Sequence, residues 1–236
     1  MTHCESQNKN FGRDEIDLLR IGRPKSVRGS ILPSHERPGH VLIREKLPEG
    51  FPSHSLDPEF LERLGRTIAA FGFLEEMLGK AIFALTATRT YPEEEIQKKL
   101  DYWLPTLLNA LSDSLQNLIE KYLKELKNHP DNQIENIPEF EEGLKALPPI
   151  RNAFCHGSWR PMNEEGFTKP YYCTKNGDLW DEPVDAAYLK RVEGAATSLA
   201  IDVINSVTVM GWSFPGSGKA GRPIVSPSDT RSKLKN

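Results

Sequence analysis

The clearest pattern in the chain is an apolar stripe between residues 57 and 87. Apolar residues recur there at spacings of three or four, the period of one helix face. Pro58 suits the first turn of a helix, and Asp57 suits the N-terminal cap before it. The pattern predicts a long helix that buries one face, made of Phe60, Leu64, Ile68, Phe71, Leu74, Leu78, Ile82 and Leu85.

A second helical pattern follows almost directly. Thr90 and Glu93 have the spacing of a capping box, with Pro92 between them. We expect the helix that opens there to bend or restart at Pro105 and to end at residues 129–132, where His-Pro-Asp-Asn stops it. Its apolar positions are Trp103, Leu107, Leu108, Leu111, Leu115, Leu118, Ile119, Tyr122 and Leu126.

Two more helical segments are predicted in the second half. A short one runs from about 138 to 147, and Pro148-Pro149 then break or restart the chain before a further turn or two that ends at Gly157. The last helix covers about 185 to 210. Its apolar stripe consists of Leu189, Val192, Ala196, Leu199, Val203, Ile204 and Val207.

Between Gly157 and the last helix, the spacing of apolar residues changes from the helical period to the alternation typical of strands. Residues 158–162, 167–174 and 178–180 read as short strands, with Asn176-Gly177 as a two-residue turn. Short connections between amphipathic helices favour antiparallel neighbours. We therefore predict a mainly α fold, an antiparallel bundle of four to five helices with a small β-hairpin inserted before the last helix.

The two ends lack these patterns. Residues 1–54 and 213–236 are poor in periodic apolar positions, so we expect mobile arms around one helical domain at 55–212. Residues 213–236 carry five cations and one anion, a net charge of +4. Such a tail either holds a polyanion loosely or only improves solubility.

Composition narrows the class of protein. The net charge of -3 gives no global field that favours nucleic acid. No apolar run approaches the ~18 residues of a membrane span, and residues 1–20 are too polar for a signal peptide. Three cysteines without a C-x-x-C pair argue against disulfides or structural zinc. We expect a cytoplasmic protein with no membrane segment, no metal and no cofactor.

The segment Arg151-Asn152-Ala153-Phe154-Cys155-His156-Gly157 carries the best candidate chemistry. Histidine can act as general base or acid near neutral pH, on a ribose 2′-hydroxyl or on a leaving oxygen. An arginine fork can hold the phosphate and stabilise negative charge. An Arg and a His placed close together can therefore cut RNA without a metal.

Helix geometry constrains this pair. Residues five apart diverge by about 140° around an ideal helix, so Arg151 and His156 are expected to point apart. Asn152 lies four residues before His156 and can orient the imidazole. Either the turn loosens before Gly157, or two copies of the chain meet across a twofold axis and share a composite site.

An Arg, a polar residue, a few more residues and a His, late in a helical bundle, resemble the R-x4-6-H motif of the HEPN superfamily. In this chain the motif reads R-N-A-F-C-H, and the resemblance covers roughly residues 55 to 212. It implies a homodimeric, metal-independent endoribonuclease of a toxin–antitoxin or phage-defence system, with a partner protein such as an antitoxin. It implies Arg151, Asn152 and His156 as the catalytic set.

The resemblance also suggests an acidic residue from an earlier helix. Glu75 lies beside the apolar stripe and is our candidate partner for Arg151, with Glu76 as the alternative. One feature departs from the family: members paired with a nucleotidyltransferase antitoxin often carry Tyr two residues after the His, where this chain has Ser158. Modification of such a tyrosine is therefore not expected.

Other residues admit two interpretations. Cys155 adjoins His156, but neighbouring helix residues point about 100° apart, so we expect a buried core thiol rather than a nucleophile. Trp159, Tyr171, Tyr172 and Trp180 either stack on bases or cover the end of the core. With Trp159, Arg160, Lys219 and Arg222 are our candidates for nucleic-acid binding.

Three functions follow from these observations: two concern the Arg-to-His segment, and the third is a nucleic-acid-binding protein that uses its basic tail at 213–236. The first is a metal-independent endoribonuclease that uses Arg151 and His156. The second is a helical dimerisation or interaction module without catalysis, in which Arg151 pairs with a glutamate of the bundle and His156 caps the helix end.

Overall fold

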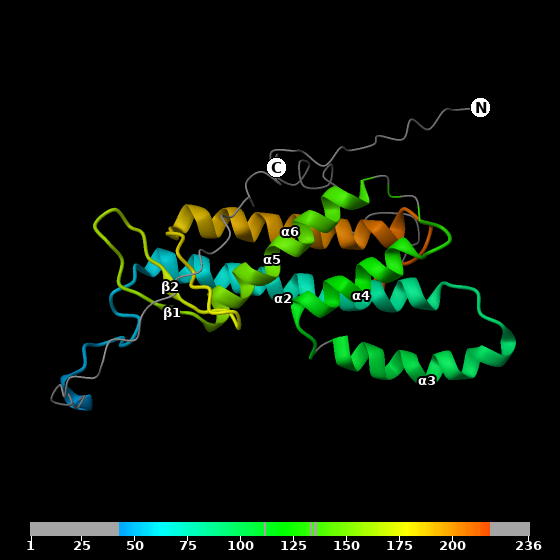
Figure 1. The fold of residues 1–236 in the computed structure, drawn as a ribbon, viewed down its shortest axis with the longest axis horizontal. Coiled ribbons are helices and arrows are strands. Elements are labelled where there is room, and N and C mark those ends of the chain that lie inside the picture. The colour runs from blue at the N-terminus through cyan, green and yellow to red at the C-terminus, as the bar shows by residue number, and fades with distance from the viewer. Residues whose placement is uncertain (1–42, 111, 133, 135, 218–236) are drawn as a thin grey trace, which may run out of the picture.

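A computed structural model describes residues 43–110, 112–132, 134 and 136–217. In this part of the chain a 3-10 turn, η1 (Arg44–Lys46), precedes five α-helices. The helices are α2 (Pro58–Ala87), α3 (Glu93–Ala110), α4 (Leu115–Lys127), α5 (Ile137–His156) and α6 (Ala186–Thr208). Strands β1 (Ser158–Trp159) and β2 (Pro170–Tyr171) pair antiparallel between α5 and α6. The predicted fold class is confirmed (Figure 1).

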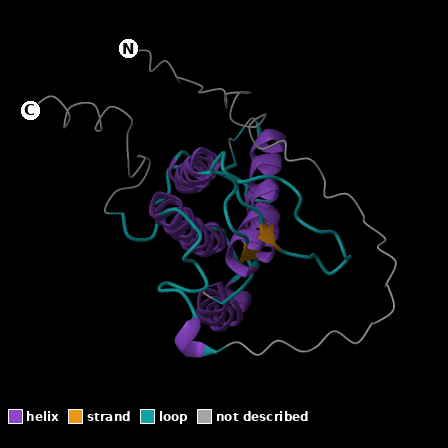
Figure 2. Ribbon diagram, turned by 90° about the vertical axis from the view of Figure 1, so that its left-hand side faces the viewer, coloured by secondary structure: helices purple, strands orange, loops and turns teal. Residues whose placement is uncertain are grey.

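Consecutive helices alternate in direction, as short connections favour (Figure 1). Because five helices alternate, the first and the last, α2 and α6, run parallel, and they form the most extensive helix pair. Viewed along the bundle in Figure 2, most helices appear end-on and the two strands lie close to one another near one helix. The core lies between α2, α6, α4 and α5.

The apolar stripes predict the core well. All the predicted core residues of α2 are buried except Ile68, which is 38% exposed, and all those of α6 are buried. Two buried polar contacts join the helices: Thr67 Oγ1 donates to the carbonyl of Leu189 at 3.1 Å, and Tyr122 Oη donates to Ser206 Oγ at 2.7 Å. These bonds satisfy polar groups that would otherwise be costly to bury.

Two predicted helix restarts at prolines are wrong. Pro105 lies inside α3, and the chain instead breaks between Ala110 and Leu115, where Ser114 caps α4 by accepting from the amide of Asn117 at 3.3 Å. Pro148 and Pro149 lie inside α5, which continues unbroken to His156.

The α5 helix tolerates its two prolines because Pro148 belongs to its buried apolar stripe, while Pro149 is exposed. Leu144, Leu147, Pro148, Ile150 and Phe154 are all buried. A proline removes one helical N–H donor and crowds the preceding turn, which usually kinks or ends a helix. Here packing of one continuous apolar face outweighs that local cost.

A small hairpin precedes the last helix as predicted, but it pairs the first two of the three predicted strands, and the third, residues 178–180, forms only an isolated bridge. Each strand has two residues, and Thr168 with Val184 and Cys173 with Leu179 form isolated bridges. The Asn176-Gly177 turn has three loop residues rather than two, because the amide of Thr174 bonds to the carbonyl of Asp178 at 2.9 Å. Gly177 has the positive φ, 86°, that such a loop requires.

The folded part extends past the predicted C-terminal boundary at 212. Phe214 is 1% exposed, and the indole of Trp212 donates to Asp131 Oδ2 at 3.2 Å. The proposed arms otherwise lie mostly at 1–42 and 218–236, outside the described residues. Among the helices that are described, none is both long enough and apolar enough to cross a membrane.

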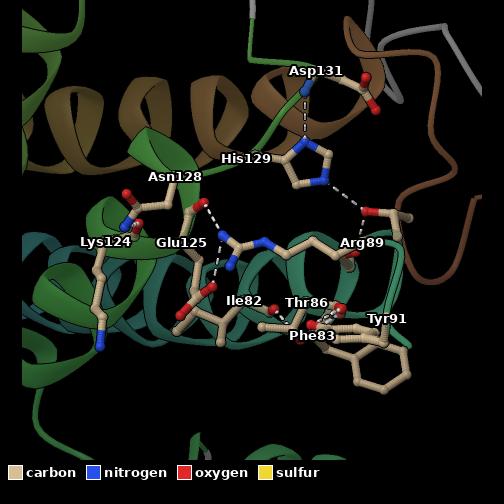
Figure 3. A network of polar contacts seen from close by, with 12 residues as sticks. Ile82, Phe83, Thr86, Arg89, Tyr91, Lys124, Glu125, Asn128, His129 and Asp131 are labelled. Carbon is tan, nitrogen blue, oxygen red and sulfur yellow. Dashed lines mark hydrogen bonds and ion pairs between the residues drawn. The ribbon is translucent and has the colours of Figure 1, made fainter. Parts of the chain in front are cut away.

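A polar network ties the C-terminal ends of α2 and α4 together (Figure 3). Arg89 Nη2 donates to the carbonyl oxygen of Glu125 at 2.8 Å and pairs with its carboxylate at 2.9 Å. Next to this pair, His129 is 4% exposed and its Nε2 lies 3.0 Å from Thr88 Oγ1. The amide of Asp131 donates to His129 Nδ1 at 3.2 Å. Because Nδ1 accepts, His129 carries its proton on Nε2 and is neutral.

Candidate functional site

The last turn of α5 positions the candidate residues. Arg151, Asn152, Cys155 and His156 all belong to regular helix, and the amide of Gly157 closes it by bonding to the carbonyl of Ala153 at 2.9 Å. Buried Ile150, Ala153 and Phe154 hold this turn on the core. The candidate side chains therefore stand on a rigid element.

Gly157 ends the helix, but not with the left-handed conformation usual for a glycine at this place. Its φ is -74° and its ψ is 142°, which is extended backbone. A Cβ at this position would lie 2.4 Å from the carbonyl oxygen of Ala153 and 2.6 Å from Pro170 Cβ. Glycine is needed here because β2 packs directly against the end of α5.

Arg151 bridges two other candidate residues. Its Nε donates to Glu75 Oε1 of α2 at 3.1 Å, and its Nη1 lies 3.3 Å from His156 Nε2. The side chains of Arg151 and Glu75 are 26% and 23% exposed. The Glu75–Arg151 ion pair expected from the sequence is present, and it holds the guanidinium of Arg151 from its Nε side.

Arg151 and His156 meet within one chain without any loosening of the helix, so the expectation that their side chains point apart is wrong. The angle of about 140° describes the Cβ directions, and the long arginine side chain spans that difference. Arginine can only donate hydrogen bonds, so the contact requires an unprotonated Nε2 on His156.

No family model, no curated protein and no solved structure matches this chain.

The other acidic and polar candidates contribute less to the geometry. Asn152 is half-buried, and among the described residues its side chain makes no hydrogen bond to His156, although both lie on one helix face. Glu76 pairs with Lys80 at 2.6 Å instead of with Arg151. Glu75 is therefore the acidic residue that joins the site.

Cys155 is exposed, so the expectation of a buried core thiol is wrong. Desolvation by its surroundings raises the pKa of the Cys155 thiol; the nearby Arg151 lowers it and Glu75 raises it. A raised pKa keeps the thiol protonated and a poor nucleophile. Cys155 therefore belongs to the surroundings of the Arg151–Glu75 pair and is not an activated group.

The candidate nucleic-acid-binding residues separate into three groups. Trp159 packs against the core, with its ring centroid 5.1 Å from that of Phe60 and 5.5 Å from that of Phe154. Arg160 is exposed and lies over the ring of Tyr171, 4.5 Å from its centroid. Lys219 and Arg222 lie outside the described residues.

The remaining hairpin aromatics cover the core. Tyr172 and Trp180 are half-buried against it, and the indole of Trp180 donates to the carbonyl of Glu182 at 2.7 Å. In the part of the chain that the structure describes, no group of three His, Cys, Asp or Glu side chains could hold a metal ion.

Proposed function

We propose that this protein is a cytoplasmic, homodimeric, metal-independent endoribonuclease of the HEPN type. The observation that carries the proposal is the arrangement of Arg151, whose guanidinium lies between Glu75 Oε1 at 3.1 Å and His156 Nε2 at 3.3 Å. A phosphate-binding cation, a neutral imidazole and a carboxylate that holds the cation are thus collected in one chain.

The proposed reaction is transesterification of RNA. A substrate phosphate displaces His156 from Arg151 Nη1 and binds the guanidinium through its non-bridging oxygens. Neutral His156 accepts the proton of the 2′-hydroxyl, and the 2′-oxygen attacks phosphorus while the 5′-oxygen leaves. The leaving 5′-oxygen takes a proton from water, so the products are a 2′,3′-cyclic phosphate and a 5′-hydroxyl, and His156 then loses its added proton to solvent. Arg151 stabilises the extra negative charge at phosphorus.

Two residues serve as positioning groups in this proposal. Glu75 holds Arg151 Nε, so that the phosphate-facing edge of the guanidinium is fixed before substrate arrives. Asn152 shares the helix face of His156 and steadies the imidazole once the phosphate has separated it from Arg151.

The homodimer is proposed from an exposed strip on α2. Gly65, Ala69 and Gly72 are exposed small residues, and Ile68 and Phe73 flank them at 38% and 39% exposure. A Cβ added to either glycine would meet no atom within 4 Å. Small residues let two helices approach closely, and a twofold pair uses the same strip on both chains. Glu75 lies seven residues, or about two helical turns, after Ile68, and therefore at the edge of this strip. A second copy bound to the strip would lie beside the candidate site.

The same strip favours the second candidate function, an interaction module without catalysis. In that case the Arg151–Glu75 pair only ties α5 to α2, and the strip binds a second copy or a defence-system partner such as an antitoxin. The two candidates differ in one measurable respect, which is whether His156 matters to any activity.

Cleavage of a mixed RNA pool in excess EDTA tests the proposal. Wild type is expected to produce cyclic phosphate ends, whereas Arg151→Ala and His156→Ala lose cleavage by at least about 100-fold, the range typical of lost acid–base or charge stabilisation. Glu75→Gln is expected to lose about 10- to 100-fold, because Arg151 is then less well oriented. Expression in bacteria should be toxic for wild type and harmless for His156→Ala if the protein is a toxin or defence effector.

A matched control separates chemistry from stability. Arg63 pairs with Glu193 at 3.8 Å across α2 and α6, with side chains 31% and 28% exposed, much like Arg151 and Glu75. Arg63→Ala should therefore cleave as wild type does. A folded wild type that leaves RNA intact would move the assignment to the interaction module, and equal cleavage by all variants would indicate a contaminating nuclease.

A further inference from the structure

The hairpin after His156 has two unlike faces. Side chains alternate along a strand, and Ser158 is paired with Tyr171 and Trp159 with Pro170. Trp159 and Pro170 face the core, the proline being buried. The opposite face presents Ser158, Arg160, Lys169 and Tyr171, all of them exposed.

On this exposed face Arg160 and Tyr171 form a stacked pair. The guanidinium carbon lies 4.5 Å from the ring centroid, and Tyr171 is 58% exposed. Lys169 is neutralised by Asp181 at 2.8 Å, whereas Arg160 makes no ion pair with any described residue. The pair therefore offers exposed aromatic surface on Tyr171 and a planar cation that no described carboxylate neutralises.

The stacked pair is held at a fixed place relative to His156. Only Gly157 separates His156 from β1, and Gly157 packs so closely on Pro170 that no side chain fits between them. Two peptide steps of ~3.8 Å and one cross-strand step of ~5 Å place the Cα atoms of His156 and Tyr171 within about 13 Å. A nucleotide or two of RNA spans such a separation.

We propose that Arg160 and Tyr171 form a base-stacking subsite that binds single-stranded RNA next to the phosphate held by Arg151. This inference rests on the proposed ribonuclease function and adds its substrate class. Tyr171 stacks on an unpaired base, while the N–H groups of Arg160 bind the adjoining phosphate. Single-stranded RNA is the occupant because bases in a duplex are already stacked on one another and do not offer a free face.

Binding and cleavage are measured in parallel to test this subsite. Binding uses a 2′-O-methyl single-stranded oligonucleotide with 2-aminopurine, which lacks the 2′-hydroxyl nucleophile and changes fluorescence on stacking. Tyr171→Leu keeps apolar bulk without a ring and is expected to weaken binding by roughly 5- to 100-fold and to abolish the fluorescence change. Tyr171→Phe should restore both, Arg160→Ala should weaken binding, and duplex RNA should bind less well than the single strand.

Phe51→Leu is the control, since Phe51 is a 48% exposed aromatic that belongs to neither strand of the hairpin. It should bind RNA as wild type does. If wild type cleaves RNA and Tyr171→Leu binds and cleaves equally well, the subsite is overturned and the ribonuclease proposal stands. If wild type does not cleave but Tyr171→Leu still loses binding and stacking, the subsite stands and the catalytic proposal fails. Equal binding of duplex and single strand would overturn the assigned substrate class.

Discussion

At the scale of single residues, the site depends on the length of the Arg151 side chain and on the absence of a side chain at Gly157. The side chain of Arg151 is long enough to contact His156, although the two Cβ atoms point in different directions around α5. It also reaches Glu75 on the neighbouring helix α2. Gly157 contributes by having no side chain, so that Pro170 can pack against the end of α5. The contacts of Arg151 bring the candidate groups together, and the close packing at Gly157 places the hairpin beside them.

Gly157→Ala is expected to destabilise the protein by about 1–3 kcal/mol, the usual cost of forcing an extra methyl into a packed place. The added Cβ would meet the Ala153 carbonyl oxygen at 2.4 Å and Pro170 Cβ at 2.6 Å, so the hairpin must move away from α5. Urea unfolding measures the change in the free energy of unfolding.

Gly194→Ala is the matched control for this substitution. Gly194 lies in α6 with no atom within 4 Å of an added Cβ, so alanine should stabilise the helix by about 0.5–1 kcal/mol. A Gly157→Ala protein as stable as wild type would show that Pro170 does not hold the hairpin against α5.

At the scale of elements, periodic burial was predictable and the helix ends were less so. The stripes of α2 and α6 repeat without interruption, and the sequence therefore identifies both helices and their buried faces. Pro105, Pro148 and Pro149 do not end their helices, and in α5 the packing of the apolar face, which a local proline preference does not report, outweighs that preference. The Glu75–Arg151 pair was predictable from its position beside the stripe, whereas the Arg151–His156 contact depends on side-chain conformation, which spacing does not report.

The network at the ends of α2 and α4 predicts a pH dependence of stability. Burial lowers the pKa of His129 from its ordinary value of 6.5; Asp131 and Glu125 raise it and Arg89 lowers it. The unfolded chain then binds a proton more readily than the folded one, so stability is complete above about pH 6.5 and declines as pH falls below it. The free energy of unfolding, measured by urea between pH 8 and pH 5, should fall with pH in wild type.

His129→Asn provides the comparison, because asparagine retains an acceptor for the amide of Asp131 but does not titrate in this range. Its stability should change less between pH 8 and pH 5. Hydrogen bonds from Lys121 and Lys127 are the first cause of the lowered pKa values of Asp113 and Glu141 respectively. These two carboxyls change the stability only at pH values below their ordinary pKa values of 3.8 and 4.5, so they do not affect the comparison between pH 8 and pH 5. Parallel pH profiles for the two proteins would mean that His129 does not couple protonation to folding.

At the scale of the whole molecule, the two sides of the longest helix, α2, differ in what they contact. One face of α2 forms the core with α4, α5 and α6, and the opposite face carries the exposed strip of Gly65, Ile68, Ala69, Gly72 and Phe73. Glu75 lies between the two, where it reaches Arg151. A second copy bound to the strip would therefore lie next to the proposed site without having to supply its arginine or histidine.

Ile68→Glu is expected to convert the proposed dimer into a monomer. In a twofold pair each substitution occurs on both chains, so two carboxylates are placed in one apolar contact and repel each other there. Ile68 is already 38% exposed, and the monomer should keep its fold. Sedimentation velocity gives the mass in solution, and circular dichroism checks the helix content.

Ile96→Glu is the control for an exposed isoleucine on another helix, α3, where it is 44% exposed. It should remain dimeric, and a wild type that stays monomeric at every concentration would remove the strip from the proposal.

Mixing Arg151→Ala with His156→Ala tests whether the arginine and the histidine of one active site come from the same copy. Arg151 and His156 of one chain already lie 3.3 Å apart, so mixed dimers, which lack any chain with both residues, should stay inactive. Recovery of cleavage in the mixture would instead mean that the arginine of one copy works with the histidine of the other.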